Sequence, residues 1–519
     1  MSKTYRSVMI VFATWLLVWL CLSWPAMQDD AFIHLRYAVN LLNHHMISYD
    51  GVHHDYGTSS LLYVWLLATA RSVFLSPLLP RVASTAFHIA LFAGLAIALS
   101  RVLGGASKLA QGLALLVLAF IVSPMAIRWL DDGMETSLAL CLVSLVAFQT
   151  SQLCHSETIS SRSLAWMFLL GLVAALTRVE FLMLLGLASL TIFSARLSLP
   201  NERNLPSGQR LQFTLRCAAP LAGGLAAAAI IFFTMHALIP DTAIAKGGTG
   251  SAWLGTLGAA LSVLVSALSF GILLLLFWLL TAATVVACKR RITLPFLFAN
   301  SPFPVTLFLA AARGQQVQGI RYFVWTLLFP ILWNILEVSW TDPPPGASAV
   351  RVVRAAMISL VAVFLLVLPF ESTLLFKEFR TRAQSLAEFR AQHLERLHSM
   401  EVTAFDVGYI GYFTESPLCD MAGLVNGRAR ARMPFADRVE LCAAEHPPYA
   451  FVSRFSLDEL GHHIDLRDWS ICSVYDLANL RAADLHYLIA SPAATAAVCA
   501  AAGNSPQPLR PLIHVLPPQ

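Results

Sequence analysis

Charged residues are scarce in this chain. Only 13% of its 519 residues are Asp, Glu, Lys or Arg, whereas 57% are hydrophobic. This balance excludes a disordered chain and differs from that of ordinary soluble domains. Residues 8–27 and 109–127 contain no charge, and about 20 such residues are enough to cross the hydrocarbon core of a bilayer. The composition therefore predicts a polytopic integral membrane protein.

Two further absences narrow the class of protein. The chain lacks a basic stripe interleaved with aromatic residues, so its net charge of +5 does not indicate a nucleic-acid partner. Basic residues in cytoplasmic loops produce such a charge in membrane proteins. A small-x-small cleavage site is also missing before Asp29, where the chain reads Trp-Pro-Ala-Met-Gln. The first apolar run is therefore expected to stay as an uncleaved helix.

The apolar runs predict an all-α transmembrane bundle of about eleven helices. Their approximate bounds are 7–25, 82–100, 109–126, 137–153, 164–177, 180–195, 217–236, 257–287, 293–311, 322–338 and 355–371. A cytoplasmic N-terminus places most basic loop residues on the cytoplasmic side, as the positive-inside rule requires, and the C-terminus outside. If residues 59–73 were a span, the run Lys289-Arg290-Arg291 would lie outside, so that topology is rejected.

The chain divides into a membrane domain, 1–371, and a C-terminal part, 372–519. In the membrane domain, the first outer loop, 28–81, contains two amphipathic stretches, 31–42 and 59–73, which are expected to lie as helices along the outer membrane surface. After residue 371 no run is long enough to cross a bilayer. This part is expected to hold a linker helix at 378–400 and an extracytoplasmic α/β domain with strands at 402–405 and 449–452.

The cysteines and histidines of this chain also lack the spacing that is typical of metal sites. None of the nine cysteines belongs to a CxxC pair. Four of them lie in the predicted outer domain, where two disulfides are expected with three pairings open: Cys419, Cys442, Cys472 and Cys499. Four clustered histidines form two adjacent pairs rather than an i, i+4 pair, so hydrated loop residues are preferred to a metal site: His44, His45, His53 and His54.

Two adjacent carboxylates, Asp29 and Asp30, follow the first predicted span. Charge at the edge of a bilayer is costly unless it serves a function, so this pair is the first candidate for a catalytic site. His34 and Tyr37 share a helix face with Asp30 through spacings of four and seven. The structural alternative is that Asp29 caps the helix that follows, which is worth about 1 kcal/mol.

More polar residues fall on the same predicted outer side. Arg178, Lys246 and Arg321 are candidates to hold a phosphate, because a guanidinium binds two oxygen atoms at once and an ammonium adds positive charge. The alternative for each is a local ion pair or a solvated residue at the interface. Glu135 lies in an acidic loop with Asp131 and Asp132, where a site and a helix cap are equally consistent with the sequence.

The order of these motifs is specific, although each is weak alone. They are Asp29-Asp30-Ala-Phe-Ile with Arg36-Tyr37, Tyr56-Gly57-Thr58-Ser59, Gly133-Met134-Glu135-Thr136, Thr177-Arg178-Val-Glu180, Pro240-Asp241-Thr242 with Ala245-Lys246, Arg321-Tyr322, Asp406-Val-Gly408-Tyr-Ile-Gly411-Tyr412 and Asp420-Met-Ala-Gly423-Leu424. Over nearly the whole chain this series resembles the terminal arabinofuranosyltransferases of actinobacterial cell-wall assembly and their relatives in other bacteria.

The resemblance implies the GT-C fold of lipid-linked-sugar glycosyltransferases. It further implies a polyprenyl-phosphate sugar as donor, membrane lipid as surroundings, and an extracytoplasmic glycan or glycoprotein as acceptor. The location implied is a bacterial inner membrane, with the C-terminal domain in the periplasm. The chain departs from the family at Asp55-Tyr56-Gly57-Thr58-Ser59, where Glu-Gly-Tyr-Thr-Ser is more frequent, at Val179, where Pro is usual, and at Asp241, where Asn is usual. These departures weaken the assignment of the donor sugar more than the assignment of the reaction.

The corresponding mechanism needs a base for the acceptor hydroxyl and cations for the phosphate. Asp29 or Asp30 is the expected base, in a direct displacement with inversion at the anomeric carbon. Arg178, Lys246 and Arg321 are expected to hold the donor phosphate. The residues expected to bind hydroxyls of the sugar or the acceptor are His34, Arg36, Tyr37, Asp55, Thr58, Glu135, Glu180 and Tyr322. No cofactor is expected, and the sequence does not indicate a divalent metal.

Other functions remain open at this point. The donor sugar is arabinofuranose by resemblance, with mannose as the alternative. A transporter or flippase for a lipid-linked substrate would also place charges in a bundle, but it predicts internal repeats and polar residues near the bilayer midplane. A membrane anchor for a sensory or carbohydrate-binding domain would not need about eleven spans.

Overall fold

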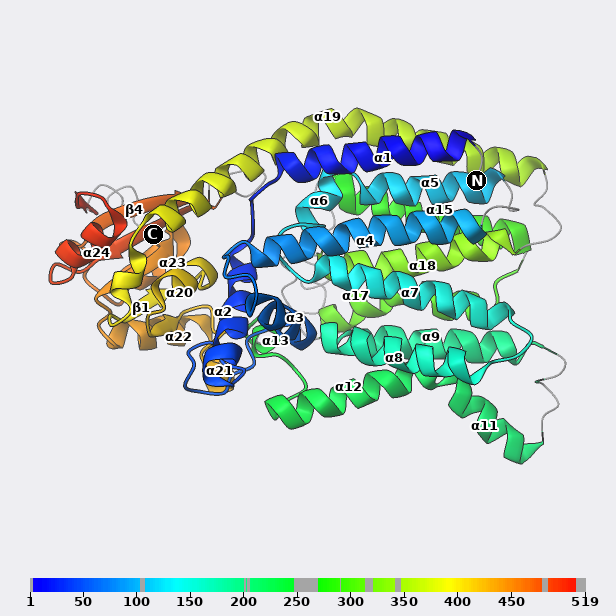
Figure 1. Cartoon of the computed structure of the whole chain (residues 1–519), viewed down its shortest axis with the longest axis horizontal. Helices are drawn as coiled ribbons and strands as arrows, with labels where there is room; N and C mark the ends of the chain where they lie inside the picture. The colour runs from blue at the N-terminus through cyan, green and yellow to red at the C-terminus, as the bar shows by residue number, and fades with distance from the viewer. Residues whose placement is uncertain are drawn as a thin grey trace.

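A bundle of long apolar helices carries a smaller, sheet-containing domain at one end, and the N-terminus lies at the other end (Figure 1). The computed structural model describes residues 3–102, 108–199, 202, 206–246, 269–289, 291–312, 321–340, 347–477 and 484–509. The chain is a multi-pass membrane protein, because several of its helices are long and apolar enough to cross a bilayer.

The helices of the bundle follow the apolar runs of the sequence. They are α1 (Lys3–Leu22), α4 (Leu79–Val102), α5 (Lys108–Ile121), α6 (Pro124–Leu130), α7 (Thr136–His155), α8 (Ser161–Thr177), α9 (Phe181–Arg196), α11 (Ser207–Cys217), α12 (Ala219–Met235), α15 (Ser269–Lys289), α16 (Leu294–Asn300), α17 (Pro302–Ala312), α18 (Arg321–Ser339) and α19 (Ala347–Ala391). Among the described residues, five helices meet the length and hydropathy expected of a span, or seven if two bent pairs each count as one. The number of about eleven spans therefore stays a prediction, and residues 257–268 of the eighth lie outside the described residues.

The predicted span 109–126 is broken. Helices α5 and α6 meet at an angle of 61°, because Ser123 caps α6 and Pro124 occupies its first turn, where it cannot continue the hydrogen bonds of α5. The bend brings Arg128 of α6 to Glu378 of α19, with Nε 3.0 Å from the carboxylate.

The first outer loop contains α2 (Asp29–His44) and α3 (Leu61–Arg71). Helix α2 runs across the end of the bundle, between the long helices and the C-terminal domain (Figure 1). Its residues 31–40 are all buried. Helix α2 was expected to lie along the outer membrane surface; in the structure it lies at the end of the bundle, and the C-terminal domain covers the face that points away from the bundle.

The C-terminal domain is built on a six-stranded mixed sheet of order β2-β1-β3-β5-β4-β6. The strands are β1 (Val402–Ala404), β2 (Leu418–Asp420), β3 (Tyr449–Ser453), β4 (Ser470–Asp476), β5 (Leu485–Ala490) and β6 (Gln507–Pro508). The helices are α20 (Gly408–Thr414), α21 (Gly427–Ala431), α22 (Phe435–Ala444), α23 (Arg454–Gly461) and α24 (Thr495–Ala502). Among the described strands, β1 pairs in parallel with β2 and β3, and the other pairs are antiparallel.

Two disulfides fix this domain. Cys419 of β2 is bonded to Cys442 of α22, and Cys472 of β4 to Cys499 of α24. These bonds select one of the three pairings that the sequence left open. Each ties a strand to a helix packed on the sheet.

Helix α19 joins the two bodies without interruption over 45 residues. The last predicted span and most of the predicted linker both lie in it, so the boundary expected at residue 371 falls inside a helix. Pro369 is its one interior proline. A short 3-10 helix, Leu394–Leu397, follows before the sheet begins.

Candidate functional site

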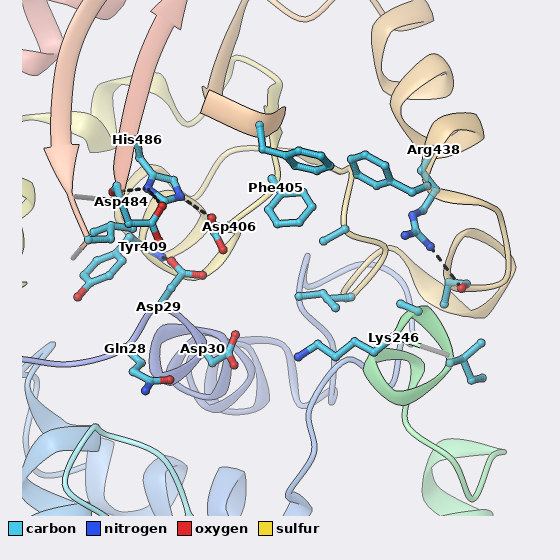
Figure 2. Close-up of a pocket in the computed structure, with 18 of the residues that line it drawn as sticks. Gln28, Asp29, Asp30, Lys246, Phe405, Asp406, Tyr409, Arg438, Asp484 and His486 are labelled. Carbon is cyan, nitrogen blue, oxygen red and sulfur yellow. Dashed lines mark hydrogen bonds and ion pairs between the residues drawn. The ribbon is translucent and has the colours of Figure 1, made fainter. Parts of the chain in front are cut away.

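A cavity of about 760 Å³ lies where α2, the end of the bundle and the C-terminal domain meet (Figure 2). Asp29 and Asp30 reach it from the first turn of α2. Lys246 reaches it from the end of α13 (Asp241–Ala245). The fold therefore gathers the predicted carboxylate pair and one predicted phosphate ligand around one space.

Asp29 is held by the C-terminal domain. The backbone N–H groups of Gly408 and Tyr409 donate to its Oδ2 and Oδ1, at 2.8 and 2.7 Å. These groups begin α20, where free N–H groups attract a carboxylate. Burial raises the pKa of Asp29 to about 8, and the charge of Asp406 adds to the rise, although both hydrogen bonds oppose it. Asp29 thus caps a helix as the structural alternative proposed, but that helix is α20 rather than its own.

A second, smaller cavity of about 40 Å³ adjoins the first. Asp30 and Lys246 line both cavities, whereas His34 and Arg178 line only the smaller one. Figure 2 shows the side chains of Asp30 and Lys246 directed toward the same space. A group lying between the two cavities would meet two cations, Arg178 and Lys246, and the carboxylate of Asp30.

Lys246 owes its position to Asp241, at the start of α13. Oδ2 of Asp241 accepts a hydrogen bond from the backbone N–H of Tyr56 in the first outer loop, at 3.1 Å. Oδ1 of Asp241 lies 3.1 Å from Nε of Arg428, in α21 of the C-terminal domain. Three segments distant in sequence are therefore tied together beside the cavity.

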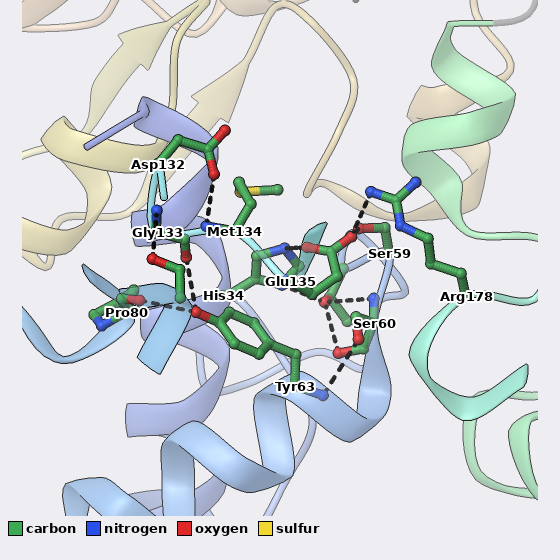
Figure 3. Close-up of polar contacts among 12 residues, drawn as sticks. His34, Ser59, Ser60, Tyr63, Pro80, Asp132, Gly133, Met134, Glu135 and Arg178 are labelled. Atoms are coloured by element: carbon green, nitrogen blue, oxygen red, sulfur yellow. Dashed lines mark hydrogen bonds and ion pairs between the residues drawn. The ribbon is translucent and has the colours of Figure 1, made fainter. Parts of the chain in front are cut away.

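Arg178 belongs to a buried polar network centred on Glu135 (Figure 3). Nη2 of Arg178 lies 2.7 Å from Oε1 of Glu135, and the hydroxyl of Ser59 donates to the same oxygen at 3.1 Å. His34 is 3.2 Å from Oε2 and 2.8 Å from the hydroxyl of Thr58. Burial alone would raise the pKa of Glu135, but Arg178 and His34 hold it well below its usual range. Glu135 is fully buried, so it orients Arg178 instead of facing a cavity.

Three more predicted residues hold the first outer loop in shape and line neither cavity. Asp55 accepts the backbone N–H groups of Tyr49 and Gly57, at 2.8 and 3.3 Å. The hydroxyl of Tyr37 accepts the N–H of Gly57 at 2.8 Å, and Arg36 donates to the carbonyl of Tyr49 at 3.2 Å. Burial raises the pKa of Asp55 to about 8. In this structure these side chains are a scaffold for the site.

The remaining three predicted site residues are Glu180, Arg321 and Tyr322. Glu180, the second carboxylate bound to Arg178, lies 3.0 Å from it, and its side chain is 40% exposed. Arg321 and Tyr322 begin α18, and their side chains lie outside what the structure describes. Their assigned roles stay predictions.

The C-terminal domain contributes residues that the sequence analysis missed. His486 of β5 is bonded through Nε2 to Asp406 and through Nδ1 to the carbonyl of Asp484, the latter at 3.0 Å. All three line the large cavity. Burial would lower the pKa of His486, but the hydrogen bond and charge of Asp406 raise it to about 9. Asp406 lay in a quoted motif, whereas nothing in the sequence around His486 distinguishes it.

A metal site needs several ligating side chains close together in the described residues. There, the group of three metal-ligating side chains that lie close together is Cys419, Cys442 and Glu445. Both thiols are consumed by a disulfide, so this group is a crosslink with a neighbouring carboxylate.

Comparisons with known proteins place the fold. A family model described as "Domain of unknown function (DUF8728)" matches residues 376–496, and no curated protein sequence matches the chain. The structure is similar to two crystal structures of ArnT from Cupriavidus metallidurans, one bound to undecaprenyl phosphate and one in the apo state. The TM-scores are 0.51 and 0.52, with 14% and 16% identity, and each comparison covers 94% of this chain and 98% of ArnT. The bundle of apolar helices therefore matches the GT-C fold of ArnT, whereas the number of about eleven spans and the resemblance to arabinofuranosyltransferases stay predictions.

Proposed function

We propose that this chain is a membrane glycosyltransferase that moves a sugar from a polyprenyl phosphate to a hydroxyl of an extracytoplasmic glycan. The observation that carries the proposal is the cavity in which Asp29, Asp30 and Lys246 meet on the fold of ArnT, which binds undecaprenyl phosphate. The order of sequence motifs favours arabinofuranose as the sugar. Mannose on the same lipid is the alternative, because the fold of ArnT supports a polyprenyl-phosphate donor without specifying its sugar.

The reaction assigned to this site is a single displacement. Asp29 takes the proton of the acceptor hydroxyl, and the oxygen attacks the anomeric carbon. The bond from that carbon to the phosphate oxygen breaks, and its electron pair leaves on the phosphate. Lys246 and Arg178 stabilise the charge that develops there. The anomeric configuration is inverted.

Asp29 suits the base better than Asp30. It lines only the large cavity, on the side of the C-terminal domain, and two backbone N–H groups fix its orientation. Its raised pKa matches a base that works near neutral pH. Asp30 shares the smaller cavity with two cations, and its assigned role is to position Lys246 and a donor-sugar hydroxyl.

The proposed location is a bacterial inner membrane with the C-terminal domain in the periplasm. Two disulfides in that domain support an oxidising compartment. The N-terminus lies at the opposite end of the bundle (Figure 1), which agrees with a cytoplasmic N-terminus.

The test uses the purified full-length protein with synthetic polyprenyl-phosphate arabinofuranose or polyprenyl-phosphate mannose and a short arabinan acceptor, read by mass spectrometry. Transfer from the arabinose donor alone supports the proposal in full. Transfer from mannose alone keeps the reaction and replaces the sugar. Stable donors in the presence of several glycan acceptors would refute a transferase.

A further inference from the structure

Three phenylalanines from separate segments of the C-terminal domain meet at the wall of the large cavity. Phe405 follows β1, Phe435 begins α22 and Phe455 lies in the first turn of α23. The rings of Phe435 and Phe455 are stacked with centroids 5.6 Å apart, and Phe405 meets them edge-on at 5.8 and 6.3 Å. We call these three residues the phenylalanine cluster.

The cluster is anchored on one side and open on the other. Phe405 and Phe435 are partly buried and pack against the hydrophobic core of the C-terminal domain. Phe455, in contrast, is 57% exposed. Phe455 therefore leaves one face of the cluster uncovered beside the cavity, and an uncovered apolar surface forgoes the free energy of burial.

The open face points into the site already described. Figure 2 shows Phe405 across the cavity from Asp30 and Lys246. The cluster and Asp29 therefore bound one continuous space, with the two cations assigned to the donor phosphate on the far side. A molecule lying on the rings would therefore share this space with Asp29, the proposed base.

We infer that the phenylalanine cluster is a subsite for a sugar ring of the acceptor glycan, next to the ring that receives the new sugar. This inference rests on the proposed function. One face of a sugar ring carries C–H groups that pack on an aromatic face, while its hydroxyls point outward along the edge. Binding sites of this kind combine an apolar surface with a few polar groups that fix orientation. Here the polar groups are Asp406, His486 and the exposed Arg432, which line the same cavity.

Binding is tested on the full-length protein in nanodiscs, with an arabinofuranosyl tetrasaccharide and a mannosyl tetrasaccharide as probes, by saturation-transfer NMR and titration. Phe455→Ala is expected to weaken binding of at least one probe by about 5- to 10-fold, the range of an aromatic stacking contact. Phe455→Trp should retain binding, because it keeps a flat face. Phe376→Ala is the matched control, since Phe376 is 43% exposed but lies on α19 and lines neither cavity.

Transfer assays separate this inference from the proposed function. With an active enzyme, Phe455→Ala should raise the KM for a tetrasaccharide acceptor and leave the KM for a monosaccharide glycoside and the kcat unchanged. Equal effects on long and short acceptors, or binding that Phe455→Ala leaves intact, would overturn the subsite. Binding that depends on Phe455 without any transfer would overturn the proposed reaction and leave a glycan site.

Discussion

Asp29 and Tyr409 are joined by a hydrogen bond of 2.7 Å, although 380 positions separate them in the chain. The bond links the first residue of α2 to the first turn of α20, so the C-terminal domain sets the position of the proposed base. A carboxylate fixed in this way is oriented before substrate arrives, which lowers the cost of reaching the reactive geometry.

Replacing Asp29 by Asn should reduce transfer by about 10²- to 10⁴-fold, the usual contribution of a general base. The amide oxygen of Asn can still accept one of the two backbone N–H groups, whereas its NH2 group faces the other, so a modest loss of about 1–3 kcal/mol in stability is expected. Asp437→Asn is the control, because Asp437 is exposed on α22 and lines neither cavity. Transfer that survives in Asp29→Asn would assign the base to another group.

The pH dependence should report the raised pKa of Asp29. A base acts when deprotonated, so kcat/KM should rise about tenfold per pH unit and level off near the pKa of about 8. The charge of Asp406 contributes to the raised pKa of Asp29. Asp406→Asn should therefore shift the rising part of the pH profile of kcat/KM to lower pH. A profile that stays in place, or moves to higher pH, would show that Asp406 does not act on the base.

Gly408 should not tolerate a side chain. A Cβ at this position would lie 1.9 Å from the backbone oxygen of Asp29, so α20 would have to move away from α2. Gly408→Ala is expected to lower the stability by about 1–3 kcal/mol and to reduce transfer. Gly461→Ala is the control, because its Cβ would meet Leu466 at an ordinary 3.5 Å. Thermal unfolding in detergent measures both, and equal unfolding temperatures would contradict the close contact.

Glu135 and Glu180 both contact Arg178 but should differ in weight. Glu135→Ala leaves a buried guanidinium without its buried carboxylate, and such losses cost about 3–5 kcal/mol. Glu180 is partly exposed, so Glu180→Ala should cost only about 0–1 kcal/mol. Chemical unfolding of the two variants checks the order. A larger loss for Glu180→Ala would mean that Arg178 relies on the exposed carboxylate.

The disulfides can be counted directly. Maleimide labelling of denatured protein should detect the five free cysteines before reduction and all nine after it. Labelling of all nine without reduction would contradict both disulfides and the periplasmic location.

Removing one bond, with Cys472→Ser and Cys499→Ser together, should destabilise the C-terminal domain by about 2–4 kcal/mol.

The sequence located features that depend on local composition. Apolar runs predicted the bundle, and the charges after the first run predicted Asp29 and Asp30, because both signals come from neighbouring residues. The strands expected at 402–405 and 449–452 correspond to β1 and β3 for the same reason. These features need no knowledge of which segments pack together.

The other features of the site depend on packing between segments distant in sequence, so they could not be predicted from local composition. His486 and Phe455 enter the site because β5 pairs with β3 and because α23 follows β3, and no local pattern reports such neighbours. Glu135 was placed among groups that bind sugar or acceptor hydroxyls because its loop is acidic, but its partners are Arg178, which follows α8, and His34, which lies in α2. The break between α5 and α6 was signalled by Ser123 and Pro124, although the apolar run around them favoured one span.

The unbroken course of α19 has a mechanical consequence. At about 1.5 Å per residue, its 45 residues form a rod that is fixed to the bundle at one end and carries the sheet domain at the other. The helix leaves no flexible tether between residues 347 and 391, so the domain cannot swing freely about this connection. Widening the cavity requires the rod to tilt as a lever or to flex at Pro369, where the proline interrupts the backbone hydrogen bonding. The lipid around this helix would then influence how readily the cavity widens.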